Sequence, residues 1–396
     1  MGDKYLTAST LVTACGRGRE AHCTALHAER TGLAAWSEGG LDLLAGAVAG
    51  VDDVALAPGL EAYDCRNARL AELTLATDDF LVRALAAVER HGAERVGIFI
   101  ATSTSGMRET EARYRDLGPE DILPADFSLD TTHRLSATTD YLRQRLGIEG
   151  PAQSISTACS SSAKVFASAA RHVDAGLCDA AVIGGVDSLC RTTLFGFHAL
   201  ELTSRGLCRP FSPDRDGLCL GEAGALGLLE REPEHAGAAE SPVALLGYGE
   251  STDAHHMSTP HPEALGARLA MRRALARSGL AADAIDYVNL HGTATPLNDS
   301  TEDLALAAEL GTNVPASSTK GWTGHTLGAA GMVEAVICQL VMAEGLLPRT
   351  LNTDRIEDDM RCNILLENGH APVRRVLSNS FGFGGNNCAL ILGEPA

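Results

Sequence analysis

The chain is poor in aromatic residues and in positive charge. Phe, Trp and Tyr make up 4% of its 396 residues, and 32 Lys and Arg stand against 51 Asp and Glu, a formal net charge of −19. Such a surface repels phosphate backbones and anionic lipid headgroups. We therefore expect no nucleic-acid partner.

Long apolar runs and paired cysteines are also missing. No uncharged apolar stretch reaches the roughly 18 to 20 residues that cross a bilayer, and Met1-Gly2-Asp3-Lys4-Tyr5 is not a basic region followed by an apolar one. We expect a cytoplasmic protein without a membrane span. The 11 cysteines include no Cys-x-x-Cys pair, which excludes the usual zinc and redox motifs. We expect no bound metal, and mostly buried thiols.

What the chain has instead is an alternation of strand and helix patterns. Short apolar runs bounded by turn residues predict strands at 95–100, 180–185, 225–229, 285–290 and 388–392. Helical periodicity predicts helices at 162–175, 264–278, 300–310 and 329–343. This alternation favours an α/β fold with largely parallel sheets covered by helices on both faces.

A chain of this length is too long to fold around a single hydrophobic core, so we expect two domains or two closely packed halves. The Gly, Ala, Ser and Pro-rich stretch 236–242 is the best seam, and we place the boundary so that the halves are 1–244 and 245–396. Each half holds a Ser/Thr-rich run that ends a strand and precedes an Ala-rich helix, at 154–163 and 317–331. This similarity predicts a duplicated fold.

Cys159 is the first candidate for chemistry. It follows a strand pattern and opens the helix predicted at 162–175, and a helix N-terminus favours the thiolate form of cysteine. The alternative is that Cys159 is simply buried, as we expect for Cys178 and Cys338.

Two imidazoles, a lysine and a glycine-rich loop accompany Cys159. His291 ends the strand at 285–290, and His325 follows Lys320 in a Gly/Thr-rich loop; open α/β sheets place ligands at such strand ends. The loop 378–387 contains glycines that permit close backbone approach, so it can aim an N–H group at an oxyanion. Read singly, each histidine is a hydrogen-bonded loop residue and the loop is an ordinary turn.

At these residues the chain resembles the elongating β-ketoacyl-[acyl carrier protein] synthases of the thiolase-like superfamily. The resemblance covers nearly the whole chain and rests on the motifs at 157–162, 208–217, 220–224, 291–299, 318–331 and 381–387. It implies a thiolase-like fold in which two α/β halves form αβαβα layers.

The resemblance also implies a reaction. Cys159 would take an acyl group from the phosphopantetheine thioester of an acyl carrier protein. Malonyl-carrier protein would then lose CO₂, and its carbanion would attack the Cys159 thioester to give a 3-oxoacyl product. His291 and His325 would stabilise the enolate.

Supporting roles follow from the same resemblance. Lys320 would support the electrostatics of the site, with Glu334 as its partner. The backbone N–H groups of Cys159 and Phe383 would form the oxyanion hole, and Phe383 would also act as a gate. Thr293 and Thr295 would hold the pantetheine arm, although local turn hydrogen bonds would explain both threonines as well. No permanently bound cofactor is implied.

Three positions depart from the family pattern. Asn386 stands where Thr is usual, Asn289 where Glu is frequent, and Ala223 where Gly is expected. None removes a catalytic group, so these departures suggest a branch tied to a specialised product. The sequence leaves the acyl chain open; its pocket is expected around 102–114 and 195–202.

The sequence also leads to expectations about protein partners. Carrier proteins are acidic, so a chain of charge −19 cannot attract them through its overall field and needs a local basic patch. We expect Arg66 and Arg69, with Arg205, to form this patch beside the mouth of the substrate tunnel. The alternative is that these arginines are simply solvated surface residues. The resemblance implies a homodimer or a heterodimer with a chain-length-factor-like homologue. A non-catalytic chain-length partner and a hydrolase or decarboxylase using the same thiolate are the competing functions.

Overall fold

The computed structural model describes residues 4–115, 117, 127–232 and 243–394. Within these ranges eleven strands form one mixed sheet, to which each half of the chain contributes a set of five that runs along the main path. The first set is β1 (Lys4–Thr13), β5 (Val96–Ala101), β6 (Ala152–Ile155), β7 (Ala180–Asp187) and β8 (Ala223–Glu230), and the second is β9 (Val243–Thr252), β10 (Tyr287–Asn289), β11 (Ala316–Ser317), β14 (Arg375–Gly382) and β15 (Asn386–Gly393).

The two sets have the same topology. In space they run β6-β5-β7-β8-β1 and β11-β10-β14-β15-β9, so the strands of each half, numbered along the chain, follow the order 3-2-4-5-1. The third, second and fourth strands pair in parallel, and the fourth, fifth and first pair antiparallel, in both halves. This shared order confirms the predicted duplication.

The expectation of largely parallel sheets is wrong. Antiparallel pairing occupies the middle of the sheet, where β1 joins the two halves by pairing with β9 through Tyr5 and Ala244. Hydrophobic periodicity marks a strand but does not fix its direction, and the short turn between β14 and β15 leaves room only for a hairpin. The seam predicted at 236–242 lies outside the described residues; β9 begins at Val243, two residues before the predicted boundary.

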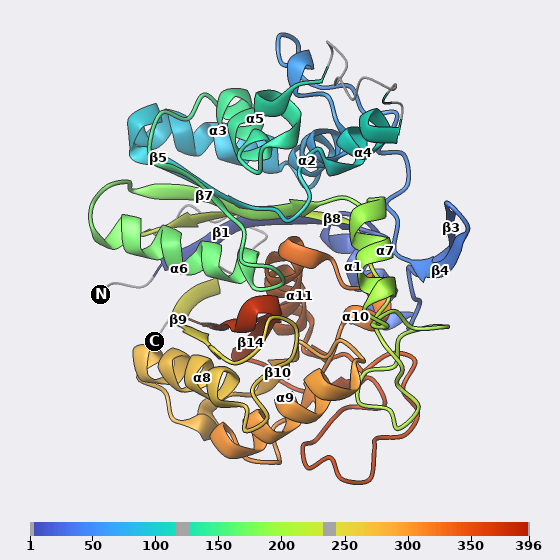
Figure 1. The fold of residues 1–396 in the computed structure, drawn as a ribbon. Coiled ribbons are helices and arrows are strands. Elements are labelled where there is room, and N and C mark those ends of the chain that lie inside the picture. Colours follow the sequence, from blue (N-terminus) through green and yellow to red (C-terminus); the bar gives the residue numbers. More distant parts are fainter. Residues whose placement is uncertain (1–3, 116, 118–126, 233–242, 395–396) are drawn as a thin grey trace.

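Helices complete five layers, αβαβα (Figure 1). One outer layer contains α2 (Arg66–Leu75), α3 (Phe80–His91) and α5 (Ala137–Leu146), and the other contains α8 (Leu265–Ser278) and α9 (Pro296–Glu309). Between the strands of the two halves lie α6 (Ser161–Asp174) and α11 (Ala330–Glu344). Smaller elements are α1 (Gly18–His27), β2 (Gly16–Arg17), β3 (Ala34–Glu38), β4 (Leu41–Ala45), α4 (Met107–Arg115), α7 (Arg191–Ala199), α10 (Lys320–Thr323), β12 (Leu346–Leu347) and β13 (Gly369–His370).

Helix α11 is the centre of the core. The segment Leu327–Glu344 is long and apolar enough to cross a membrane, with mean hydropathy 1.5, but 83% of it is buried inside the protein. It is therefore a buried helix of the core. A Cβ atom at Gly331 would lie 2.6 Å from the backbone nitrogen of Ala163 in α6, so α6 and α11 touch through their backbones. This contact fixes the start of α6, and Cys159 lies just before its N-cap Ser160.

Candidate active site

Cys159 lies in a sharp turn between β6 and α6. Ala158 adopts a left-handed conformation with φ 54°, and Ser160 is the N-cap of α6. The turn is fixed by Ser161, whose hydroxyl accepts a hydrogen bond from the Thr157 N–H at 2.8 Å and donates to the Ala158 carbonyl at 2.5 Å. The sulfur is thus held just before the helix, and Cys159 is buried.

His291 is positioned by a buried carboxylate. It follows β10, and the backbone N–H groups of His291 and Gly292 donate to Glu302 at 2.8 and 2.7 Å. Asn379 on β14 donates to the same carboxylate at 3.1 Å. Glu302 and Asn379 were not predicted, because nothing in a single sequence marks a helical acid eleven residues after a histidine as its support.

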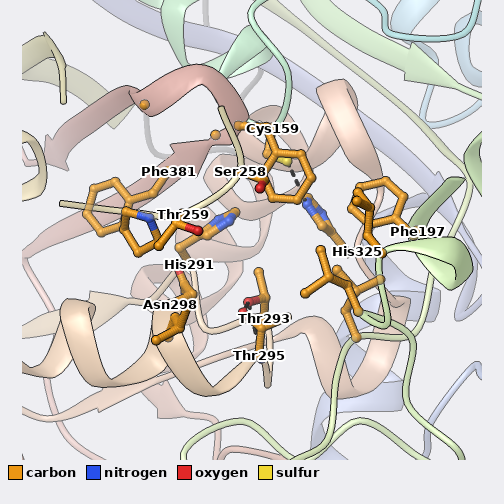
Figure 2. A pocket seen from close by; sticks show the side chains of 18 of the residues that line it. Cys159, Phe197, Ser258, Thr259, His291, Thr293, Thr295, Asn298, His325 and Phe381 are labelled. Carbon is orange, nitrogen blue, oxygen red and sulfur yellow. Dashed lines mark hydrogen bonds between the residues drawn. The ribbon is translucent and has the colours of Figure 1, made fainter. Parts of the chain in front are cut away.

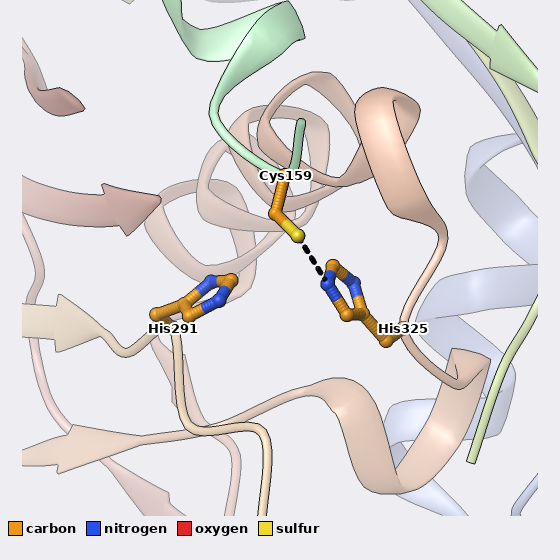
Figure 3. Close-up of side chains that lie close together, drawn as sticks. All are labelled: Cys159, His291 and His325. Carbon is orange, nitrogen blue, oxygen red and sulfur yellow. Dashed lines mark hydrogen bonds between the residues drawn. The ribbon is translucent and has the colours of Figure 1, made fainter. Parts of the chain in front are cut away.

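His325 reaches Cys159 from the loop after α10. Its backbone N–H donates to the Cys219 carbonyl at 2.7 Å, and its Nε2 atom lies 2.9 Å from the Cys159 sulfur (Figure 3). The rings of His291 and His325 are 5.4 Å apart at an interplanar angle of 87°. The structure thus brings the three predicted residues together, with ligand atoms within 4.8 Å of one another.

Such a donor set could hold a thiophilic cation such as zinc. A second group of this kind is Cys23, His27 and Glu344, on α1 and α11.

Lys320 and Glu334 form a buried ion pair beside His291. The Lys320 Nζ atom lies 2.5 Å from Glu334 Oε1 and 3.4 Å from His291 Nδ1. An ammonium group has donors and no acceptor, so Nδ1 of His291 accepts and the ring proton resides on Nε2.

Burial makes the site neutral. It raises the pKa of the Cys159 thiol to about 11, against the lowering effects of Lys320 and of the backbone N–H groups of Phe383 and Cys159. Burial, with Lys320 as the next cause, lowers the pKa of His291 and of His325 well below the usual range. At neutral pH the site therefore holds a thiol and two neutral imidazoles.

The expectation of a thiolate at the helix N-terminus is thus wrong for the free protein. Cys159 precedes the N-cap instead of lying in the first turn, and the loss of hydration outweighs the nearby positive charge. The sulfur can instead pass its proton to His325 Nε2.

The loop between β14 and β15 lies against Cys159. Phe383 begins a short turn, Phe383–Gly385, in which Gly384 and Gly385 have φ of 75° and 70°. A Cβ atom at Gly382 would lie 3.1 Å from the Cys159 nitrogen. The backbone N–H groups of Phe383 and Cys159 both interact with the sulfur, so both are near enough to donate to an oxyanion formed there.

A cavity of about 370 Å³ leads to the sulfur (Figure 2). Thr293 and Thr295 line it, with their hydroxyl oxygens 2.8 Å apart. The Phe383 ring packs on Phe197, with ring centroids 5.5 Å apart. Other lining residues, Asp253, Ser258, Thr259 and Pro260, come from a loop after β9 that the sequence did not single out.

The arginines expected at the tunnel mouth are placed differently. Arg66 is buried, and its guanidinium binds Glu222 at 2.5 Å and Asp52 at 2.8 Å; its prediction as a docking residue is wrong, because it is a structural cation. Arg69 is bound by both carboxylate oxygens of Asp64, at 2.6 and 2.7 Å. Arg205 is exposed. Among the described residues, none of the three lines the cavity.

None of the three departures from the family pattern is among the described residues that line the cavity. Asn386 accepts a hydrogen bond from Lys164 at 3.1 Å, and Asn289 donates to Thr319 at 3.3 Å.

The fold and the comparisons with known proteins together define a condensing enzyme. The families described as "Beta-ketoacyl synthase, N-terminal domain" and "Beta-ketoacyl synthase, C-terminal domain" match residues 68–235 and 243–354. The chain belongs to the β-ketoacyl synthase family, whose members are acyltransferases that form a carbon–carbon bond between an acyl thioester and malonyl-carrier protein.

Curated relatives carry the corresponding name. The chain is 36% identical to the 3-oxoacyl-[acyl-carrier-protein] synthase 2 of Rhizobium meliloti over 80% of each chain. It is 33% identical to the enzyme of the same name from Vibrio cholerae over 77% of each.

Solved structures with the same fold come from ketosynthases. A chain of the complex of the ketosynthase ApeO with its chain length factor ApeC, from Xenorhabdus doucetiae, is 38% identical with a TM-score of 0.90, and the match covers 100% of this chain and 98% of that one. A chain of the ishigamide ketosynthase/chain length factor is 25% identical, also with a TM-score of 0.90, and the match covers both chains fully.

Proposed function

We propose that the protein is the catalytic ketosynthase of a specialised polyketide or polyene pathway in the cytoplasm, and that it pairs with a chain-length-factor-like homologue. The observation that carries the catalytic part is the 2.9 Å contact between the Cys159 sulfur and His325 Nε2 at the end of an open cavity.

Acyl transfer comes first. The Cys159 sulfur attacks the carbonyl carbon of an acyl-phosphopantetheine thioester, and its proton passes to His325 Nε2. The N–H groups of Cys159 and Phe383 stabilise the oxyanion. The bond from carbon to the pantetheine sulfur breaks, and that thiolate takes the proton, which leaves a neutral His325 beside an acyl-cysteine.

Condensation follows at the same cysteine and beside the same two histidines. Malonyl thioester loses CO₂, and the electrons of the broken bond form an enolate. His291, with its proton fixed on Nε2 by Lys320, and His325, once its ring proton has moved from Nδ1 to Nε2, donate to the enolate oxygen. The enolate carbon then attacks the acyl carbonyl and the bond to Cys159 breaks. The 3-oxoacyl thioester leaves, and the released Cys159 thiolate takes a proton from water.

The phosphopantetheine arm is the only prosthetic group in this proposal, and it arrives on the carrier protein. The hydroxyls of Thr293 and Thr295, which line the cavity, hydrogen-bond the amides of the arm. Phe383, half-buried against Phe197, separates the acyl and malonyl positions. A purely non-catalytic chain-length partner would have no use for the placement of Cys159 between two imidazoles.

The heterodimer is supported by the free edge of the sheet. Strand β6 lies at the end of the strand order, and its Ala152 and Gln153 are exposed. Large apolar side chains are exposed on α4 and close to the turn 129–133: Tyr114 (56%), Leu129 (54%) and Leu135 (39%). An edge strand that pairs on one side only within the described residues favours pairing with another chain, and both solved structures named above are complexes of a ketosynthase with a chain length factor.

Intact-protein mass spectrometry tests the catalytic proposal. The protein is incubated with a panel of acyl-carrier proteins, and the added mass is located by peptide mapping. We expect an adduct on Cys159, none on Cys159→Ala, and retained malonyl decarboxylation by that variant. An adduct on another cysteine, or CO₂ release from the native protein without any condensation product, would contradict the proposal.

Size-exclusion chromatography tests the pairing. We expect the purified chain to form a stable dimer with a co-expressed chain-length-factor homologue in preference to a homodimer. A stable, fully active homodimer would contradict the proposed heterodimer but not the proposed reaction.

A further inference from the structure

A cysteine, a histidine and a glutamate meet where α1 packs against the end of α11. Cys23 and His27 lie four residues apart on α1 and therefore on one face of the helix, and Glu344 is the last residue of α11. One side-chain donor atom of each residue lies within 4.8 Å of the other two. We name these three residues the α1–α11 cluster. None of them is among the described residues that line the cavity leading to Cys159.

Hydrogen bonds and ring packing anchor the elements that carry the cluster. The Asn368 side-chain amide donates to the Leu26 carbonyl of α1 at 2.9 Å. Asn368 directly precedes β13, whose His370 stacks on the His27 ring with the two centroids 6.0 Å apart. Strand β13 pairs with β12, which follows α11 after a single glycine. The three donors are therefore presented by elements that are tied to one another.

The donor set of the cluster is one that zinc prefers. Thiolate sulfur, imidazole nitrogen and carboxylate oxygen are its usual protein ligands, and three of them with one water complete a tetrahedron. Zinc bonds of about 2.0–2.3 Å place the donors of such a tetrahedron about 3.5 Å apart. The His27 Nε2 and Glu344 Oε2 atoms are 3.8 Å apart. Small side-chain rotations would therefore bring all three donors to coordination distance.

The charges around the cluster also favour a cation. Burial, with the charge of Glu344 as the next cause, raises the pKa of the Cys23 thiol, so the sulfur holds a proton beside the carboxylate at neutral pH. A divalent cation would replace this proton, which passes to water, and would bind the thiolate and the carboxylate together. The side chains of His27 and Glu344 are 42% and 46% exposed, so a hydrated cation can reach them directly.

We propose that the α1–α11 cluster binds a zinc ion, which clamps α1 against the end of α11. The expectation of no bound metal followed from the absence of Cys-x-x-Cys pairs in the sequence. That absence says nothing about ligands that come from opposite ends of the chain. The inference is independent of the proposed function, because Cys159, His291 and His325 form a separate group.

Cobalt(II) provides the first test, because its absorption spectrum reports sulfur ligation and tetrahedral geometry in zinc sites. The full chain carries Cys159→Ala throughout, which removes the thiol of the active-site group. One equivalent of Co²⁺ should give a sulfur-to-cobalt charge-transfer band and intense visible bands, and Zn²⁺ should remove them by displacing the cobalt. Adding Cys23→Ser should abolish the charge-transfer band. His27→Ala and Glu344→Gln should each weaken cobalt binding by about tenfold or more, since even residues that only support a ligand contribute that much.

Two matched variants serve as controls in the same background. Cys15 is a half-buried thiol outside the cluster, and Glu20 is an exposed carboxylate on α1. Cys15→Ser and Glu20→Gln should therefore bind cobalt like the parent protein. Far-UV circular dichroism without metal checks that each variant is folded. A charge-transfer band that persists in Cys23→Ser, or that is missing from the Cys159→Ala parent, overturns the zinc site.

The melting temperature tests the clamp. A cation that binds only when α1 and α11 lie together stabilises the folded chain by mass action. Zn²⁺ in slight excess should therefore raise the Tm of the Cys159→Ala parent and leave that of the variant with Cys23→Ser added unchanged. Zinc binding through Cys23 without any rise in Tm, or an equal rise in both proteins, overturns the clamp.

Discussion

Cys159 is kept as a thiol until substrate arrives. Its pKa of about 11 follows from burial, and the two imidazoles beside it are neutral because burial lowers their pKa. Nucleophilicity therefore depends on proton transfer to His325 during attack, and the resting sulfur is protected from electrophiles, which react with thiolates.

This protonation state predicts the pH dependence of alkylation. The rate at which iodoacetamide modifies Cys159 should rise about tenfold per pH unit from neutral pH towards pH 10, because only the thiolate reacts and its fraction grows until the pKa is reached. The rate is measured by peptide mass spectrometry. A plateau already at neutral pH would show that the sulfur is ionised in the free protein.

Glu302, the carboxylate that holds His291, predicts a pH dependence of stability. Burial raises its pKa from 4.5 to about 7, so the folded protein binds its proton more tightly than the unfolded chain does. Its contribution to the free energy of unfolding is complete below pH 4.5 and is lost as the pH rises towards 7.

Glu302→Gln cannot titrate and should not show this loss. Between about pH 4.5 and pH 7 the stability of the variant should improve relative to native protein by about 3 kcal/mol, measured by urea unfolding. Any fixed penalty for placing an amide beside two N–H donors is the same at both pH values. A difference that does not change with pH would contradict the assigned pKa.

At the scale of secondary-structure elements, helices α6 and α11 pack closely against each other at Gly331. A Cβ atom there would lie 2.6 Å from the Ala163 nitrogen and 2.8 Å from its Cβ, and backbone cannot yield as a flexible side chain can. Gly331→Ala should therefore lower the free energy of unfolding by about 1–3 kcal/mol and slow acylation, since Cys159 lies at the start of α6.

A glycine on α7 supplies the control for this prediction. At Gly196 an added Cβ meets nothing within 4 Å, so Gly196→Ala should be neutral or stabilise by up to about 1 kcal/mol, the helix preference of alanine. Urea denaturation of both variants checks the pair. Equal effects at the two positions would mean that close packing at Gly331 is unimportant.

Apolar patterns in the sequence predicted the elements whose buried side chains are apolar throughout. The strands and helices predicted from apolar runs occur within a few residues of their expected bounds, whereas strands β1, β9 and β14 and helices α1, α3 and α5 were not predicted. β1 and β14 carry buried polar side chains that interrupt the pattern. Thr7 donates to Glu230, Ser9 to Gln339 and Asn379 to Glu302, and these partners lie far along the chain. A polar residue in a sequence suggests an exposed position as long as its hydrogen-bond partner is unknown.

The candidate site shows the same limit. The motifs identified Cys159, His291, His325, Lys320 and Glu334, which the structure brings together. The local spacing of Arg66 and Arg69 suggested a shared surface, but Arg66 pairs with Glu222, 156 residues away. Whether an arginine docks a partner or fills a core depends on such distant contacts, which a single sequence does not contain.

At the scale of the whole molecule, the halves share one core. Helix α11 comes from the C-terminal half, yet Met332 packs against Gly227 of β8 and Gly331 against Ala163 of α6. One cluster of buried side chains includes Leu6 and Ile183 from the first half and Val333 and Leu390 from the second. Duplication of topology has therefore not produced two independent folding units.

This shared core predicts a single unfolding transition. Far-UV circular dichroism and the fluorescence of Trp36 and Trp322, one in each half and the latter buried, should report the same urea midpoint, as expected for one cooperative unit. Expressed alone, residues 1–232 should lack cooperative unfolding and near-UV dichroism, because removing α11 exposes the inner face of β7 and β8. A fragment that unfolds cooperatively by itself would show that the N-terminal half carries its own sufficient core, and that α11 serves only to position Glu334 and the loop of His325.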